Sequence, residues 1–395
     1  MSLHSAPCVR AVGTWHERPR LLVAVSGNLP EWREAFQRSP DRPRLPLPYT
    51  FGASCHAVGF DLCAVDLAAR ADDRGATAPF LRVFRAKDAA KAIGSSDLAL
   101  LSGSLGISSI MRQTILSPMA GRRIAMFTYT WDTRGSPSAT RRARLAMTRL
   151  AARSARGVVV MTREQAEAAR RRLPRSRPVI DLRVGVDYAF YSRPASVSDV
   201  PEEYRATVEC LLDGPYAILP GGQQRLNRET LDVFAGSSLR LVRVAQSGAR
   251  SGVSELASEA ERRGMADRIV VFEKIDYRFL RFLFQNAAAY AGIVDSSWQP
   301  AGWTAACESL ASGTPVVLLE GLVSRELACL KPSRRIVKTV PMGDANAFRR
   351  ELERHACPAR KCETARTARA FARANLDLED TGRAFAHRLA RTFCA

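Results

Sequence analysis

The stretch that most constrains the fold runs from Ala287 to Glu320, where strand, loop, helix and strand patterns follow one another. AAAYAGIV is a continuous apolar run followed by Asp295, as expected for a strand buried in a parallel sheet. The turn-rich SSWQPAGW comes next. TAACESLAS then has the apolar spacing of a helix that Thr304 can cap, Gly313 ends and Pro315 cannot continue. PVVLLE is the next buried strand, so this stretch predicts a parallel α/β unit.

The loop of this unit is a candidate anion site. Gly302 precedes the helix, and a helix start offers free N–H groups and the positive end of a dipole to a phosphate. Glu308 lies just over one turn into the helix, where its carboxylate could reach the hydroxyl groups of a ligand. Most loops of this kind bind nothing, so the pattern alone is weak evidence.

Length and composition point to two domains. The chain has 395 residues, beyond the size at which one core usually divides, and its 46% apolar content is enough for two cores. No apolar run reaches the ~20 residues of a membrane span, and the N-terminus has no continuous apolar signal segment. We therefore expect a cytoplasmic protein. The nine scattered cysteines then indicate reduced thiols, and none has the spacing of a metal site.

The net charge is +20, mostly from arginine. It is explained either by a solvated surface rich in arginine or by attraction to polyanions such as lipid headgroups, nucleic acid or nucleotide-bearing substrates. Basic helices are predicted at 138–157 and 163–177, and helices of this kind can lie on anionic membranes.

Strand and helix patterns alternate on both sides of a polar, irregular segment at 197–214. This alternation predicts two doubly wound α/β domains joined by a linker. We place the first at 1–196 and the second at 215–375. A last helix at 376–395 is expected to cross back to the first domain.

CESLASGTPVV, from Cys307 to Val317, resembles the second half of the donor-site signature of the retaining family 4 glycosyltransferases. Glu308 takes the place of the second Glu of that signature. The first Glu falls on Pro300, or on Gln299 if one inserted residue is allowed, so a carboxylate is missing. A second departure is Trp131, which replaces the His of a His-Asp-like pair at the end of the strand at 122–130.

Two further segments carry the resemblance. VIDLRVGVDYAFYSRP at 179–194 is similar to the segment that closes the first domain in the family. In 216–231, Arg225 and Arg228 stand where the family has basic residues for the donor diphosphate, and arginine can bind phosphate oxygens in a bidentate way.

The resemblance implies a GT-B fold, with two Rossmann-like domains facing each other across a cleft. It implies transfer of a sugar, with retention, from a nucleotide-diphosphate donor (UDP, GDP or dTDP type) to an acceptor hydroxyl, without a metal or other cofactor. The implied catalytic residues are Asp132, Arg225 and Arg228, and the implied acceptor-binding residues are Asn28 and Trp131. The implied donor-binding residues are Gly27, Gly221, Gly222, Gln223, Lys274, Ile275, Gln299, Gly302, Trp303, Thr304 and Glu308.

The acceptor is expected to be a glycan, a lipid or a small molecule, with peripheral contact to an anionic membrane and no specific nucleic-acid binding. Two alternatives belong to other classes. The missing carboxylate and the missing His favour an inactive GT-B scaffold or partner protein. The arginine-rich helices favour a polyanion-binding protein.

Overall fold

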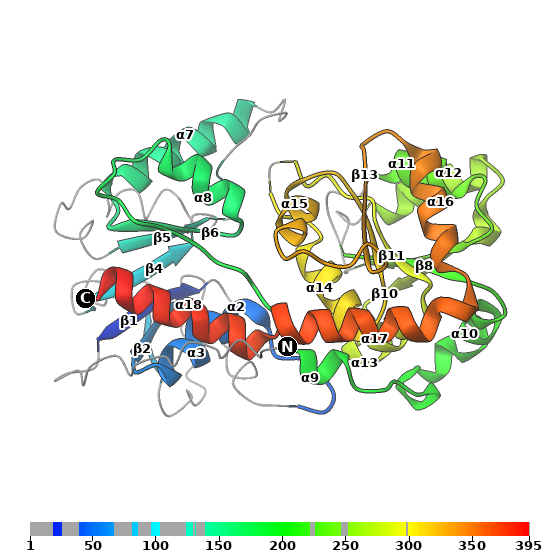
Figure 1. The fold of residues 1–395 in the computed structure, drawn as a ribbon, viewed down its shortest axis with the longest axis horizontal. Helices are drawn as coiled ribbons and strands as arrows, with labels where there is room; N and C mark the ends of the chain where they lie inside the picture. The colour runs from blue at the N-terminus through cyan, green and yellow to red at the C-terminus, as the bar shows by residue number, and fades with distance from the viewer. Residues whose placement is uncertain are drawn as a thin grey trace, which may run out of the picture.

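The structure is a computed structural model that describes residues 19–25, 39–66, 81–85, 96–102, 124–128, 131, 139–221, 226–245, 252–297 and 299–394. These residues form two separate parallel sheets covered by helices (Figure 1). The predicted α/β class with two Rossmann-like domains is therefore confirmed.

The first sheet has seven strands in the order β3-β2-β1-β4-β5-β6-β7, and all its pairs are parallel. Its strands are β1 (Arg20–Val25), β2 (Asp61–Asp66), β3 (Leu81–Arg85), β4 (Leu98–Ser102), β5 (Ile124–Thr128), β6 (Gly157–Val160) and β7 (Val179–Asp181). The described helical elements of this half are α2 (Pro46–Pro48), η1 (Tyr49–Ala53), α3 (Ser54–Ala57), α7 (Ala139–Ser154) and α8 (Arg163–Arg170).

The second sheet has six parallel strands in the order β10-β9-β8-β11-β12-β13, which repeats the order of the first six strands of the other sheet. Its strands are β8 (Tyr216–Pro220), β9 (Arg240–Ala245), β10 (Ile269–Glu273), β11 (Ala289–Gly292), β12 (Val316–Leu319) and β13 (Val337–Val340). β8, β11 and β12 are buried along their whole length, which explains their unbroken apolar sequences.

Helices cover both faces of this sheet. They are α11 (Asn227–Phe234), α12 (Val253–Arg262), α13 (Tyr277–Asn286), α14 (Trp303–Ser312), α15 (Leu322–Ala328) and α16 (Ala345–His355), with the short η5 (Ala266–Arg268). In the described part of the chain, no helix has the length and apolarity needed to cross a membrane.

The chain passes between the domains twice, and the two passages touch. After β7, the N–H of Val186 donates to the carbonyl of Leu376 at 2.8 Å, and the N–H of Leu378 donates to the carbonyl of Val186 at 2.9 Å. Gly185 makes this approach possible, because a Cβ atom there would lie 2.8 Å from the Leu376 carbonyl oxygen and 2.2 Å from Oγ1 of Thr381.

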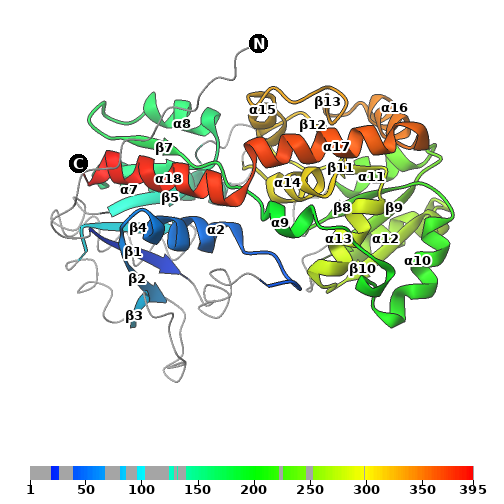
Figure 2. The same cartoon turned by 60° about the horizontal axis from the view of Figure 1, so that its bottom comes forward.

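The last two helices span both halves of the molecule. α17 (Pro358–Asn375) lies on the second domain and α18 (Leu378–Phe393) on the first (Figures 1 and 2). Phe385 of α18 packs edge-on against Phe51, with 5.6 Å between ring centroids, and Arg388 forms an ion pair with Asp181 at 2.7 Å.

The segment that follows the first passage differs from the irregular linker expected at 197–214. It forms α9 (Tyr188–Tyr191), η3 (Val197–Asp199), η4 (Glu202–Tyr204) and α10 (Arg205–Leu212). This segment packs on the second domain from α9 onward, so the contact with that domain begins before the expected domain end at 196. Gln285 of α13 donates to the carbonyl of Tyr191 at 3.0 Å, and Arg281 of α13 forms an ion pair with Asp199 at 2.9 Å. Few side chains of this segment are buried, for example Val208 and Leu211 of α10, and the rest of its sequence is mostly polar. The apolar spacing is therefore too sparse to indicate helices from the sequence.

Gly185→Ala should lower the free energy of unfolding by about 1–3 kcal/mol, because the added Cβ must displace backbone atoms of the second passage. Urea unfolding of the purified protein measures this loss. Gly214→Ala is the matched control, because its Cβ would meet within 3.4 Å only the flexible end of Arg240. Equal stabilities of the two variants would contradict the tight crossing.

Candidate active site between the two domains

A cavity of about 780 Å³ lies between the domains, at the carboxyl edge of the second sheet. This is the edge where open α/β sheets bind ligands. Pro220, Ala245 and Lys274, at the ends of β8, β9 and β10, line it from the second domain. Met161 and Asp187, which follow β6 and β7, line it from the side of the first domain.

The start of α14 forms one wall of the cavity. The N-cap is Gly302, in the left-handed region with φ of 86°, and a Cβ atom there would lie 2.9 Å from Oη of Tyr290. Thr304 was expected to cap the helix, but it lies inside the first turn and its side chain is exposed. The N–H of Trp303 donates to the carbonyl of Pro300 at 3.3 Å. The next amides at a helix start have no intrahelical partners, so this end can hold an anion.

Glu308 lies one turn further along α14, and Tyr191 of α9 holds its carboxylate. The Tyr191 hydroxyl donates to Oε1 of Glu308 at 2.7 Å. Burial raises the pKa of Glu308 from its usual 4.5 to about 7, and the bond from Tyr191 opposes this rise. Glu308 lines the cavity, and its ionised carboxylate can accept hydrogen bonds from ligand hydroxyls.

Arg44 closes the cavity from the first domain, in the proline-rich segment before α2. Its backbone N–H and its Nε both donate to Oδ2 of Asp187, at 2.9 and 3.2 Å, and its Nη1 pairs with Glu379 of α18 at 3.1 Å. Burial acts to lower the pKa of Arg44, but Asp187, Tyr49 and Glu379 together outweigh it, and the pKa is raised. This cation therefore ties both interdomain passages to the cavity wall.

Trp303 has a structural contact in addition to its place in the cavity wall. Its indole Nε1 donates to the carbonyl of Val184 at 2.7 Å, across the domain boundary. A second bridge lies between α8 and α15, where the N–H of Arg163 donates to Glu326 at 2.8 Å. The cavity thus lies between domains that are held in contact on two sides.

The structure brings eight of the predicted site residues into this one cavity. They are Gly221, Lys274, Ile275, Gln299, Gly302, Trp303, Thr304 and Glu308. Six others lie outside the described residues: Gly27, Asn28, Asp132, Gly222, Gln223 and Arg225.

Two predicted residues lie elsewhere. Trp131 is fully buried in a small core beneath β6 and α8, where it packs near Val158 and Ala166. Its role as an acceptor-binding residue is corrected, because a side chain without exposed surface cannot contact an acceptor. Arg228 is exposed at the start of α11 and is not among the described residues that line the cavity, so its assignment to the diphosphate stays a prediction.

Sequence analysis missed Arg44, Asp187 and Tyr191 as site residues. Tyr191 and Asp187 belong to the segment at 179–194, which was used only to mark the end of the first domain. The polar groups of these two residues within that segment were the available signal. Arg44 carried no signal, because it lies among prolines without any periodic pattern.

Within the ranges that the structure describes, no group of three or more His, Cys, Asp or Glu side chains could hold a metal ion. The groups in the cavity wall that suit a charged organic ligand are the start of α14, Lys274 and Glu308.

No protein-family model matches the sequence, and no curated protein matches it. Solved structures do match. The chain is similar to sucrose-phosphate synthase from Thermosynechococcus elongatus, with a TM-score of 0.69, 18% identity, and coverage of 95% of this chain and 100% of that one. It is similar to Anabaena HepE in complex with UDP-glucose, with a TM-score of 0.65, 14% identity and coverage of 94% and 99%.

A third similar structure is α,α-trehalose 6-phosphate synthase from Burkholderia multivorans, with a TM-score of 0.66, 13% identity and coverage of 95% and 97%. Identities this low establish the fold alone. The similarity extends over nearly the whole chain and so includes both doubly wound domains. The chain therefore has the GT-B fold.

The raised pKa of Glu308 predicts a pH-dependent stability. Between pH 4.5 and about 7 the folded protein keeps a proton on this group that the unfolded chain has released, so the group makes folding less favourable as the pH rises through that window. Glu308→Gln should therefore gain about 2 kcal/mol of stability relative to the parent between pH 5 and pH 8.

Urea unfolding of both proteins at several pH values tests this. Glu209→Gln, which changes an exposed carboxylate of α10, is the control and should show a much smaller change. A difference between Glu308→Gln and the parent that stays constant with pH would contradict the burial of the charged group.

Proposed function

We propose that the protein is a glycosyltransferase that moves a sugar from a nucleotide-diphosphate donor to an acceptor hydroxyl. The observation that carries the proposal is the cavity in which the start of α14 and the carboxylate of Glu308 lie on one wall. A helix start suits a diphosphate, and an ionised carboxylate suits the two hydroxyls of a ribose.

UDP is the nucleotide that we propose to test first, because Anabaena HepE, a protein of the same fold, was solved in complex with UDP and with UDP-glucose. In this proposal Lys274 and Ile275, after β10, lie next to the base, and Gln299 faces the sugar. The acceptor enters from the first domain.

The chemistry requires that negative charge be stabilised on the leaving diphosphate as the glycosidic bond breaks. The amides at the start of α14 supply part of this stabilisation, and Arg225 is proposed to supply the rest without a metal. Asp132 is proposed to orient the acceptor hydroxyl. Retention of the anomeric configuration is proposed from the similarity of 307–317 to the retaining family.

An inactive scaffold is the alternative that a specific observation favours, namely Gln299 in place of a carboxylate. Incubation with UDP-glucose in the absence of an acceptor distinguishes the enzyme from the scaffold, because an active glycosyltransferase should slowly release free sugar. A protein that binds the donor and never releases sugar would be a scaffold.

Glu308→Ala should weaken binding of UDP itself by about 10- to 100-fold, because a charge-assisted pair of hydrogen bonds to the ribose contributes about 1.5–3 kcal/mol. Gln299→Ala should leave UDP binding nearly unchanged and weaken binding of UDP-glucose. Calorimetric titration of both ligands into both variants measures this split.

Each variant serves as the control of the other, since both change residues of the same cavity wall. If Glu308→Ala folds and binds UDP as the parent does, the donor site is wrongly placed. Equal losses for UDP and UDP-glucose in Gln299→Ala would remove Gln299 from the sugar position.

The first domain is proposed to meet an anionic acceptor or membrane through the end of α8 and the turn after it. Arg171 and Arg175 are exposed there. Arg170 is less suitable for a test, because it donates to the carbonyl of Val179 at 3.0 Å and so supports β7.

Arg171→Glu with Arg175→Glu should reduce association with vesicles that contain anionic lipid by about 30-fold or more at low salt, because each basic residue near the surface contributes about 1 kcal/mol and two are lost. Sedimentation with vesicles measures it. Arg366→Glu with Arg373→Glu makes the same charge change on α17, where both side chains are exposed, and should have little effect. Equal losses would show that only the net charge matters.

A further inference from the structure

A second cavity, of about 490 Å³, lies in the second domain at the opposite edge of its sheet. Residues just before β11, β12 and β13 line it, namely Ala288, Pro315 and Arg335. Side chains from α16 and α17 complete the wall. Because the donor cavity lies at the carboxyl ends of the strands, the two cavities are separate sites.

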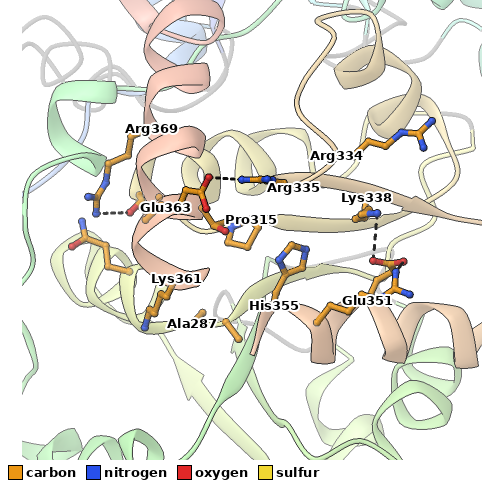
Figure 3. A pocket seen from close by; sticks show the side chains of 17 residues that line it. Ala287, Pro315, Arg334, Arg335, Lys338, Glu351, His355, Lys361, Glu363 and Arg369 are labelled. Atoms are coloured by element: carbon orange, nitrogen blue, oxygen red, sulfur yellow. Dashed lines mark hydrogen bonds and ion pairs between the residues drawn. The ribbon is translucent and has the colours of Figure 1, made fainter. Parts of the chain in front are cut away.

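The wall of this cavity is strongly basic. Six cationic side chains line it against two carboxylates, Glu351 and Glu363. The cations are Arg334, Arg335, Lys338, Arg354, Lys361 and Arg369. Figure 3 shows that His355 lies in the middle of this wall, with Lys338 and Glu351 on one side and Arg335 and Glu363 on the other.

Part of this charge has a structural purpose. Lys361 donates to the carbonyl of Asn286 at 3.2 Å and Arg369 to that of Ser312 at 2.9 Å, so these two cations satisfy the carboxyl ends of α13 and α14. Arg335 pairs with Glu363.

The remaining charge is not balanced. Glu351 is shared by Lys338, at 3.7 Å, and Arg354, at 2.5 Å. One carboxylate therefore faces two cations, and Arg334 adds a third at the rim, where it is exposed.

Four polar atoms of the residues that line this cavity have no hydrogen-bond partner among the described residues. They are Oγ of Ser312, Oε2 of Glu351, Nε2 of His355 and Nε of Arg369. Ser312 is the most informative, because only 1% of its surface is exposed, and a buried hydroxyl normally has a partner. Ser312, His355 and Arg369 can donate from these atoms once their side chains turn toward the acceptor oxygens of a ligand, whereas the Glu351 oxygen is an acceptor that lies 3.7 Å from Nζ of Lys338.

We propose that this cavity binds a small phosphorylated anion, such as free phosphate or a sugar phosphate. Excess positive charge with hydroxyl and guanidinium donors is the chemistry that holds a phosphate group, and the volume lies within the range of small-molecule sites. Burial lowers the pKa of His355 to about 4, although Glu351 opposes this, so the neutral ring adds a hydrogen bond without charge.

This site is independent of the proposed donor cavity, and calorimetry on the full chain at pH 7 separates the two. The titrants are inorganic phosphate, a hexose 6-phosphate and the same hexose without phosphate, each with and without saturating UDP. We expect the phosphorylated titrants to bind and the plain hexose not to bind, and UDP to leave the affinity unchanged. Tighter binding of the ester than of phosphate would identify a sugar phosphate, and equal binding would identify free phosphate.

Arg354→Gln, Lys338→Gln and Ser312→Ala should each weaken the binding by about 5- to 20-fold, which matches the loss of one hydrogen bond or ion pair. Arg350→Gln is the matched control, because Arg350 is exposed on the same helix α16 and does not line the cavity. Lys338 and Arg354 lie near the surface, so these variants should fold.

Three outcomes would overturn the proposal: no binding of either phosphorylated titrant at 10 mM (about the weakest affinity of interest), binding that UDP displaces, or binding that the three variants leave unchanged. Displacement by UDP would place the phosphate in the donor cavity instead.

Discussion

The structure depends on the contact between the two passages of the chain from one domain to the other. Two backbone hydrogen bonds join Val186 to Leu376 and Leu378, and Gly185 allows the backbones to approach. Each sheet on its own could tolerate many orientations of its partner. The paired passages fix one orientation, because α17 and α18 run directly from this contact onto the two domains. The width of the cleft is therefore set by backbone geometry at its floor.

The same contact organises the cavity. Asp187, next to Val186, caps α9 and accepts hydrogen bonds from the backbone N–H and the Nε of Arg44. Helix α9 in turn places the Tyr191 hydroxyl against the carboxylate of Glu308. A change in the backbone at Val186 would therefore be transmitted to the Glu308 carboxylate through Asp187 and Tyr191. This proximity explains why polar groups in a segment that connects the domains also form the cavity wall, and why both domains must be in contact before the site is complete.

Most of the fold could be predicted because buried parallel strands have long apolar runs, as in 287–294 and 316–319, and because glycine and proline mark their ends. Gly313 does end α14 as expected, with φ of 93°. The failures have common causes. Thr304 and Gly302 both suit a helix start, and local sequence cannot rank them when the tight approach of Tyr290 decides. Trp131 was assigned from its place after a strand, but its burial follows from helices distant in sequence. Arg44 meets its partners only through the tertiary fold.

Gln299 in place of a carboxylate has a physical consequence for the proposed donor. A nucleotide diphosphate brings at least two negative charges, and Glu308 already costs free energy as an anion in this cavity, as its raised pKa indicates. A second carboxylate nearby would repel both Glu308 and the diphosphate, and hydrogen bonds to the sugar hydroxyls would have to offset this repulsion. The neutral amide removes that repulsion and keeps a donor and an acceptor. In the proposed donor site, the substitution is therefore expected to alter which sugar hydroxyls are recognised more than whether the diphosphate is held, and this expectation favours a change of donor sugar over a loss of donor binding.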